Sequence, residues 1–168
     1  EIYLSVTSDL GNQPRECTRM SASENTINTG GYASILPAKI VIRARWHPEA
    51  TSGNLSWVRQ VVAHEFTHIV TFAAIEESLF PLRRLMANLT LPMWFIEGLA
   101  QYEAEEWHSL KEMVLRDEAQ REEIMSEGSL GAFYFFEGWG RTSGYYQSDS
   151  FVRYIFDYYG KDKIARIL

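Results

Sequence analysis

The sequence predicts an α+β fold in which a small strand-rich lobe is followed by a mainly helical one. The first third of the chain holds short alternating or β-branched segments between turn residues, as strands do. From residue 55 onward, apolar residues recur at helical spacing instead. A length of 168 residues, of which 46% are hydrophobic, suits a single domain whose core can be divided between two lobes.

Two segments are predicted to be strands. Residues 2–6 alternate apolar and polar side chains, which is typical of a half-buried strand. Residues 39–46 form the clearest strand, because they are rich in β-branched residues and end at His47-Pro48. The polar residues 8–29 and the breaker Gly30-Gly31 predict turns between these strands.

Helices are predicted over most of the remaining chain. Residues 55–75 contain no proline or glycine, and this is where helical spacing is clearest. One stripe of this helix consists of Trp57, Val61, His64, His68 and Phe72. Residues 78–88 have a proline near their start, where a helix tolerates it. Leu91-Pro92 then opens a third helix over residues 93–107.

The C-terminal part divides into three segments. Residues 107–127 are strongly charged, and we interpret them as a solvated surface helix supported by i,i+4 ion pairs. Residues 128–144 are rich in glycine and aromatic side chains, which leaves their secondary structure open. A last helix is expected over residues 148–159, ended by Gly160.

Composition excludes several classes of protein. The formal net charge is −6, from 16 basic and 22 acidic side chains, and no basic patch suggests a nucleic-acid partner. No apolar run approaches the ~20 residues that cross a bilayer. Cys17 is the only cysteine, so an intrachain disulfide and a cysteine-rich zinc cluster are both excluded. Because the chain begins at Glu1 rather than Met, we expect a processed protein or one domain of a longer protein.

The segment His64-Glu65-Phe66-Thr67-His68 carries the clearest chemical signal. Histidines at i and i+4 lie about 40° apart around a helix axis, so both imidazoles can reach one metal ion. Glu65 lies about 60° from His68, where its carboxylate can face a water molecule at the metal without being a ligand. Nitrogen ligands, an open position and a carboxylate base are what zinc-dependent hydrolysis requires. Apolar residues on both sides of the motif favour a central helix.

A catalytic zinc ion has three protein ligands and a water molecule, so a third ligand is expected. Glu97 is the strongest candidate, because its carboxylate interrupts a run of large apolar residues and needs a partner. The alternatives are His47, before a proline at a strand end, and His108, at the start of the charged helix. Gly98 would let another helix or the metal site approach this backbone closely.

These motifs together resemble a known family. His64-Glu65-x-x-His68 followed by Trp94-x-x-Glu97-Gly98-x-Ala100 is similar to the gluzincin metallopeptidases, which include thermolysin and the aminopeptidase N-like enzymes. The similarity is greatest to the bacterial family usually called peptidase MA-like, which ends in a Tyr-x-Gln-Ser segment, an aromatic helix and a Tyr-Gly pair. Tyr145-Tyr146-Gln147-Ser148 and Tyr159-Gly160 stand here, so the resemblance covers residues 30–168.

The resemblance implies a gluzincin (zincin-like) fold and one Zn²⁺ ion per chain. The implied zinc ligands are His64, His68 and Glu97, and Glu65 is the implied general base. We therefore expect a single metallopeptidase-like domain over residues 1–168. Its strand-rich lobe, with a small mixed sheet and the motif helix, would occupy residues 1–75, and its helical lobe residues 76–168.

A tyrosine after the third ligand stabilises the oxyanion in the aminopeptidase-like relatives. Tyr145 is our first choice for that role and Tyr146 is the reserve, because a phenol can donate one hydrogen bond to developing charge. The alternative for both is aromatic packing.

Departures from the family pattern limit what the resemblance implies. The Gly-x-Met-Glu-Asn segment that captures a free amino terminus is absent, which weakens an exopeptidase assignment. Gln101 stands where thermolysin has an aspartate that orients a zinc-bound histidine, which leaves Gln101, Glu103 and Asp149 as candidates for that role. By analogy, we expect the strand over residues 39–46 to be a sheet edge that pairs with an extended peptide substrate.

The predicted function is a zinc-dependent metallopeptidase that acts on a peptide or protein substrate. The alternative is a catalytically silent, peptidase-like domain that binds zinc or a partner within a larger protein. Glu65 favours catalysis, because a structural zinc site is closed by four ligands and needs no base. Hydrolysis of a non-peptide amide would use the same residues. The resemblance to this family also implies an extracytoplasmic location.

Overall fold

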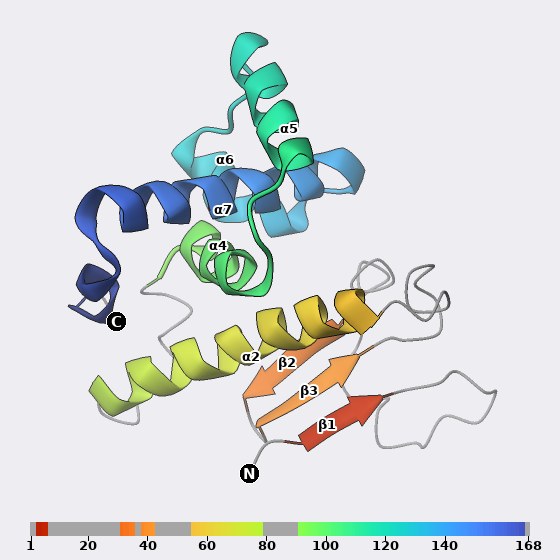
Figure 1. Ribbon diagram of the computed structural model, residues 1–168, viewed down its shortest axis with the longest axis vertical. Helices are drawn as coiled ribbons and strands as arrows, with labels where there is room; N and C mark the ends of the chain where they lie inside the picture. Colours follow the sequence, from red (N-terminus) through yellow and green to blue (C-terminus); the bar gives the residue numbers. More distant parts are fainter. Residues whose placement is uncertain (1–2, 7–30, 36–37, 43–54, 79–90, 167–168) are drawn as a thin grey trace, which may run out of the picture. The chain divides into compact units, whose positions relative to one another are not determined.

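The computed structural model describes residues 3–6, 31–35, 38–42, 55–78 and 91–166 (Figure 1). Its elements are β1 (Tyr3–Val6), β2 (Gly31–Ile35), β3 (Ala38–Ile42), α2 (Leu55–Ser78), α4 (Met93–Ala104), α5 (Ser109–Gln120), α6 (Glu127–Ala132), the 3-10 helix η4 (Phe133–Phe135), α7 (Gly138–Tyr159) and the 3-10 helix η5 (Lys161–Arg166). One small sheet and several helices confirm the predicted α+β class. Of the helix predicted over residues 78–88, all but the first residue lies outside the described residues.

The chain divides into two compact units, residues 1–66 and residues 67–168, and the boundary falls within α2. The predicted division into lobes at residues 75 and 76 stays a prediction. None of the helices in the described ranges combines the length and the apolar character of a membrane span.

β3 is the central strand of the sheet, whose strand order is β1-β3-β2. β1 runs parallel to β3 with Tyr3 opposite Lys39, and β2 runs antiparallel to β3 with Gly31 opposite Ile42. The successive residues 40–42 of β3 are all buried. Because successive side chains of a strand point to opposite faces, both faces of β3 are covered. The expectation that the strand over residues 39–46 forms a sheet edge is therefore wrong, since β2 occupies that edge of the described sheet.

β2 begins at Gly31, one of the two glycines that predicted a turn. The close approach of β3 and α2 explains why this residue is a glycine. A Cβ at Gly31 would lie 2.8 Å from the carbonyl oxygen of Val41 in β3 and 2.9 Å from Val61 Cγ1 in α2. A glycine inside a strand often marks such an approach of another backbone or side chain. The first half of α2 thus packs against β2.

Helices α4 and α7 form the core of residues 67–168 and run side by side (Figure 1). Phe95 and Leu99 of α4 pack against Val152 and Phe156 of α7, and each pair is four residues apart on its helix. As predicted, α4 begins directly after Pro92, whose carbonyl accepts the first helical hydrogen bonds. It ends at Ala104, before the predicted residue 107, because the backbone of the next residue is extended.

Helix α7 begins at Gly138, well before the predicted residue 148. The glycines and aromatic residues of this segment left its secondary structure open in the sequence, and in the structure Gly144 serves packing within the helix. A Cβ on Gly144 would overlap the ring of Phe133, which has no exposed surface. Gly160 ends α7 as predicted, with a φ of +87° that favours glycine.

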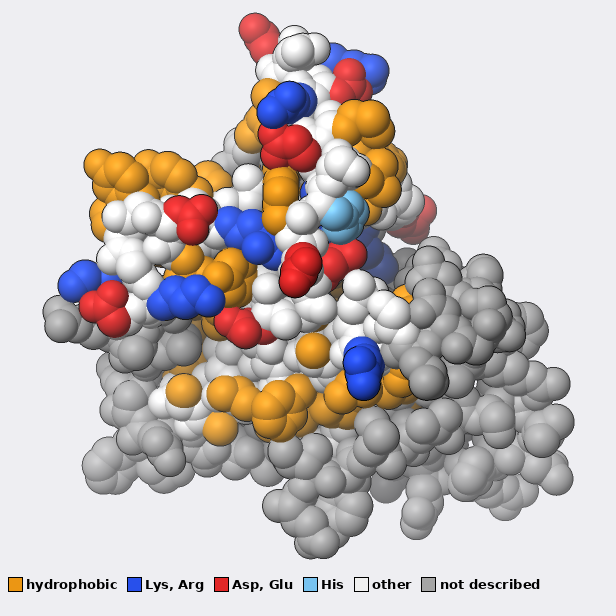
Figure 2. Space-filling view, in the orientation of Figure 1, with side chains coloured by type: hydrophobic (Ala, Val, Ile, Leu, Met, Phe, Trp, Pro, Cys, Tyr) orange, Lys and Arg blue, Asp and Glu red, His pale blue; other side chains and the backbone are white. Residues whose placement is uncertain are grey.

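Helix α5 is only partly the solvated helix that the charge pattern predicted. Its outer face fits the prediction, with i,i+4 ion pairs of Glu112 with Arg116 and of Asp117 with Arg121. Figure 2 shows charged side chains of both signs along this helix. Its inner face does not fit, because Lys111, Val114 and Glu118 are buried. The prediction of a solvated helix is therefore wrong for this face. Its three residues are spaced by three and four positions, which puts them on one side of the helix.

Replacing Gly98 with alanine is expected to lower the free energy of unfolding by about 1–3 kcal/mol. The new Cβ would overlap the Ser148 carbonyl oxygen and lie 2.8 Å from Val152 Cγ2, so α4 and α7 would have to separate. The matched control is Gly131→Ala in α6, where a Cβ meets nothing within 4 Å and alanine is expected to be neutral or stabilising. Urea denaturation measures both variants, and equal midpoints would contradict the expectation.

Candidate metal centre

The motif residues His64, Glu65 and His68 lie in the middle of α2. This helix begins at Leu55 as predicted and is uninterrupted to Ser78. Glu65 is buried, with 8% of its surface exposed, and both histidines keep a small part of their surface exposed. Trp57, Ile69 and Ile75 are buried along the same helix, whereas Phe66 and Val70 are exposed, so the apolar flanks of the motif are only partly buried.

Glu97 is a buried carboxylate in an otherwise apolar stretch of α4. All of its neighbours from Phe95 to Ala100 are buried with it. Its Oε2 lies 3.5 Å from His68 Nε2, and both side chains keep only about a tenth of their surface exposed. Two ligands that are each about 2.1 Å from a tetrahedral zinc ion lie about 3.4 Å apart. The distance between this histidine and this carboxylate therefore fits a shared metal ion.

The structure brings together the three side chains that the sequence singled out as ligands. One ligand atom each of His64, His68 and Glu97 lies within 4.8 Å of the others. Two imidazoles and a carboxylate are the donor set of one class of catalytic zinc site. The residues present therefore fit a zinc ion.

Glu65 lies on the side of α2 that faces β2. The position of a Cβ on Gly31 would be 3.6 Å from Glu65 Cγ. The strand backbone therefore runs next to the side chain of Glu65, the residue that the family resemblance implies as the base. A larger residue at position 31 would displace both the strand and this side chain.

The alternative residues have other contacts. His108 is the residue before α5, and its Nε2 lies 3.2 Å from Glu105 Oε1. His47, the other alternative ligand, lies outside the described residues. Asp149, one of three candidates to orient a zinc-bound histidine, binds Lys111 and Arg153 through its two carboxylate oxygens.

The two candidate tyrosines lie in different surroundings on α7. The ring of Tyr145 packs edge-on against Phe133, with 5.0 Å between the ring centroids. Lys111 Nζ lies 5.7 Å from the ring centroid of Tyr146. Burial, together with the nearby Glu105 carboxylate, raises the pKa of the Tyr146 hydroxyl, and Lys111 only partly opposes this. Aromatic packing, the alternative role for both tyrosines, is thus present at Tyr145. The role of Tyr145 as a hydrogen-bond donor to the oxyanion stays a prediction.

Gln147, in the segment that resembles the family's Tyr-x-Gln-Ser, has a structural role. Its Nε2 donates to Glu118 Oε2 at 2.9 Å and to Ser143 Oγ at 3.0 Å. Its Oε1 accepts a hydrogen bond from the backbone nitrogen of Met125 at 2.9 Å. The motif therefore ties α7 to α5 and to the chain that follows α5.

Comparison with protein families supports the resemblance over most of the chain. The family model described as Peptidase MA superfamily matches residues 32–168, which include the motif helix, Glu97 and the segment around Gln147. No curated protein and no solved structure matches the chain. The resemblance of the motifs to this family is thereby confirmed, and the chain belongs to the Peptidase MA superfamily.

Proposed function

We propose that this protein is a zinc-dependent metallopeptidase of gluzincin fold that hydrolyses peptide bonds. The observation that carries the proposal is the group of His64, His68 and Glu97, with the buried Glu65 on the same helix as the histidines. Within the described ranges, no further histidine, cysteine or carboxylate joins these three residues as a fourth ligand. Three protein ligands and an open position are typical of catalytic zinc sites, whereas structural sites have four ligands.

The proposed roles follow from the chemistry of each side chain. Bound zinc would supply a Lewis acid and lower the pKa of a water molecule. Glu65 would accept a proton from the attacking water and pass it to the leaving amine. Tyr145 would donate a hydrogen bond from its neutral hydroxyl to the oxyanion that develops on the substrate.

We also propose that an extended substrate pairs with β2 rather than with β3. A peptide can add to a sheet only at an edge, and β3 is central in the described sheet. β2 is at an edge, and its Gly31 lies next to Glu65. The substrate backbone would then run past the general base.

A peptide-library digest tests the proposed reaction. The zinc-loaded protein is expected to cleave peptides, to stop when a chelator removes the metal, and to recover when zinc is returned. Absence of cleavage by the fully loaded protein would favour the catalytically silent alternative. Cleavage that resists complete metal removal would contradict the proposed mechanism.

Tyr145→Phe is expected to lower kcat by about 10²–10³-fold, because it removes one hydrogen-bond donor to the oxyanion. The zinc content should be unchanged, since Tyr145 is not among the proposed ligands. Tyr146→Phe is the matched control and should leave kcat close to that of the unmodified protein. Steady-state kinetics on one cleaved peptide decides between them, and the opposite ranking would transfer the role to Tyr146.

A further inference from the structure

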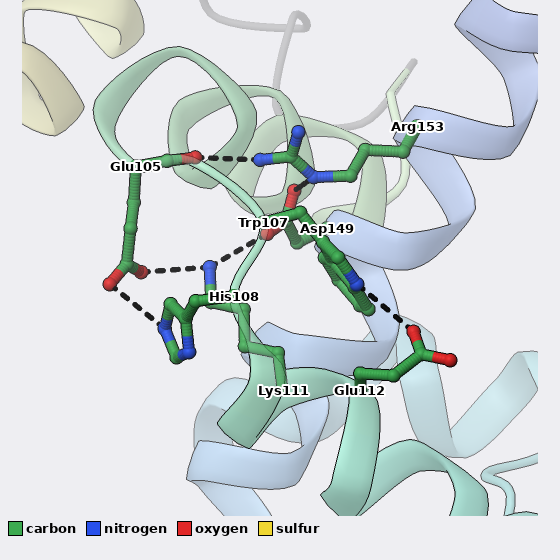
Figure 3. A network of polar contacts seen from close by, with 7 residues as sticks. All are labelled: Glu105, Trp107, His108, Lys111, Glu112, Asp149 and Arg153. Atoms are coloured by element: carbon green, nitrogen blue, oxygen red, sulfur yellow. Dashed lines mark hydrogen bonds and ion pairs between the residues drawn. The ribbon is translucent and has the colours of Figure 1, made fainter.

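Lys111 lies at the centre of a buried ion network that joins three helices (Figure 3). Its Nζ is 2.7 Å from Glu105 Oε2 and 2.7 Å from Asp149 Oδ2, and the side chains of Lys111 and Asp149 have no exposed surface. Asp149 Oδ1 accepts a hydrogen bond from Arg153 Nε at 2.8 Å. Arg153 Nη2 in turn donates to the backbone oxygen of Glu105 at 2.6 Å. The positive charges of Lys111 and Arg153 are therefore balanced by the negative charges of Glu105 and Asp149.

Stability does not account for burying these charges. Removing an ion from water costs several kcal/mol, and well-packed apolar side chains of similar volume are often as stabilising as a buried ion pair. What such a network does provide is a fixed orientation of the helices that carry it, because charge-assisted hydrogen bonds are short and specify the orientation of their partners. This network sets the end of α4, the first turn of α5 and the middle of α7 in one arrangement.

The network and a close helix contact together fix the position of α4. Glu105 is the residue directly after α4 and belongs to the network. At the other contact, a Cβ on Gly98 would overlap the carbonyl oxygen of Ser148, the residue before Asp149. Glu97 is adjacent to this second contact. A helix is stiff along its axis, with a rise of about 1.5 Å per residue, so a shift of α4 at Glu105 would reach Glu97.

From this geometry we infer that Lys111 and Asp149 are positioning residues for Glu97. The inference rests on the proposed metal centre and adds to it the residues that hold its carboxylate ligand in place. A zinc ion holds its nitrogen and oxygen ligands at about 2.0–2.2 Å, so a displacement of α4 that moves the Glu97 carboxylate away from the two histidines weakens metal binding. The partners that orient a metal ligand typically change metal affinity by about 10–100-fold when they are replaced.

A double-mutant cycle on zinc affinity tests the inference. Lys111→Met/Asp149→Leu removes one positive and one negative charge together, so the remaining Glu105 and Arg153 still balance. Competition with a chromophoric chelator should give a zinc Kd raised about tenfold or more. With Glu97→Ala already present, the same pair of substitutions should change the Kd by less than about twofold. An equal loss in both backgrounds would indicate general structural weakening and overturn the inference, as would an unchanged Kd in the first.

A control variant, a fallback variant and the zinc binding of the unmodified protein separate the possible failures. Replacing the exposed pair by Asp117→Asn/Arg121→Gln should leave the Kd unchanged, because this pair lies on the outer face of α5. If near-UV circular dichroism shows that the double variant does not fold, Asp149→Asn enters the same cycle, since it keeps the side-chain volume. If the unmodified protein binds no zinc, the proposed metal centre itself is wrong. If its binding depends on Glu97 but not on Lys111 and Asp149, only the positioning role is wrong.

Discussion

Glu65→Gln is expected to lower kcat by about 10²–10⁴-fold while the zinc content stays at the unmodified level. The amide has the size of the carboxylate but cannot accept the proton of the attacking water. Zinc should be retained, because the grouped ligand atoms belong to His64, His68 and Glu97. Peptide cleavage and elemental analysis of the same sample measure the two quantities.

The matched control for this substitution is Glu106→Gln. Glu106 is an exposed carboxylate that follows α4 and does not belong to the metal group. Its variant should cleave peptides at the unmodified rate. Full turnover by Glu65→Gln would contradict the assignment of the base, and loss of zinc from it would mean that Glu65 belongs to the ligand set.

Lys111→Met is expected to lower the free energy of unfolding by about 3–5 kcal/mol. The side chains of Lys111 and Asp149 have no exposed surface, so removing the cation leaves the Asp149 carboxylate buried with Arg153 as its remaining partner. Urea denaturation measures the effect. The double variant Lys111→Met/Asp149→Leu should recover most of the loss, because it removes both members of the pair.

The exposed pair of Arg116 with Glu112 is the control for this prediction. The side chain of Arg116 keeps 75% of its surface exposed and that of Glu112 keeps 44%, so Arg116→Met should change the free energy of unfolding by less than about 1 kcal/mol. A Lys111→Met variant as stable as the unmodified protein would contradict the expectation. So would a double variant that is less stable than the single one.

The sequence singled out the motif helix and the residues His64, His68 and Glu97 because each of them stands out in a local pattern. Helical periodicity alone determines that His64 and His68 share one side of α2. Glu97 stood out as a carboxylate within an apolar run, which is an anomaly that a sequence displays directly. The start of α4 was equally local, since Leu91-Pro92 marks it. The structure brings these three side chains together.

The missed elements depend on contacts between distant segments. Gly31 predicted a turn because glycine is common in turns, but it lies in a strand where Val61 of α2 passes close by. The glycine-rich segment that contains Gly144 left its secondary structure open, and the structure shows that Gly144 makes room for the ring of Phe133 within α7. No local pattern contains such a partner. The central position of β3 belongs to the same class, because the order of strands is a property of the whole sheet.

The ion network was missed for a different reason. A run of charges is usually a solvated face, and the outer face of α5 follows that rule. The spacing of Lys111, Val114 and Glu118 could have revealed the inner face. Steps of three and four residues put these two charged residues on the same face of the helix as the apolar Val114. The buried partner of Lys111, Asp149, comes from α7 and could not be identified from that spacing.

The metal content of the purified protein, measured by elemental analysis beside that of Glu97→Ala, tests the proposed centre most directly. One zinc ion per chain is expected in the unmodified protein, and a strongly reduced content is expected in the variant, which keeps only two of the three grouped ligands. Absence of zinc from the unmodified protein after remetallation, or full retention in Glu97→Ala, would contradict the three-ligand site.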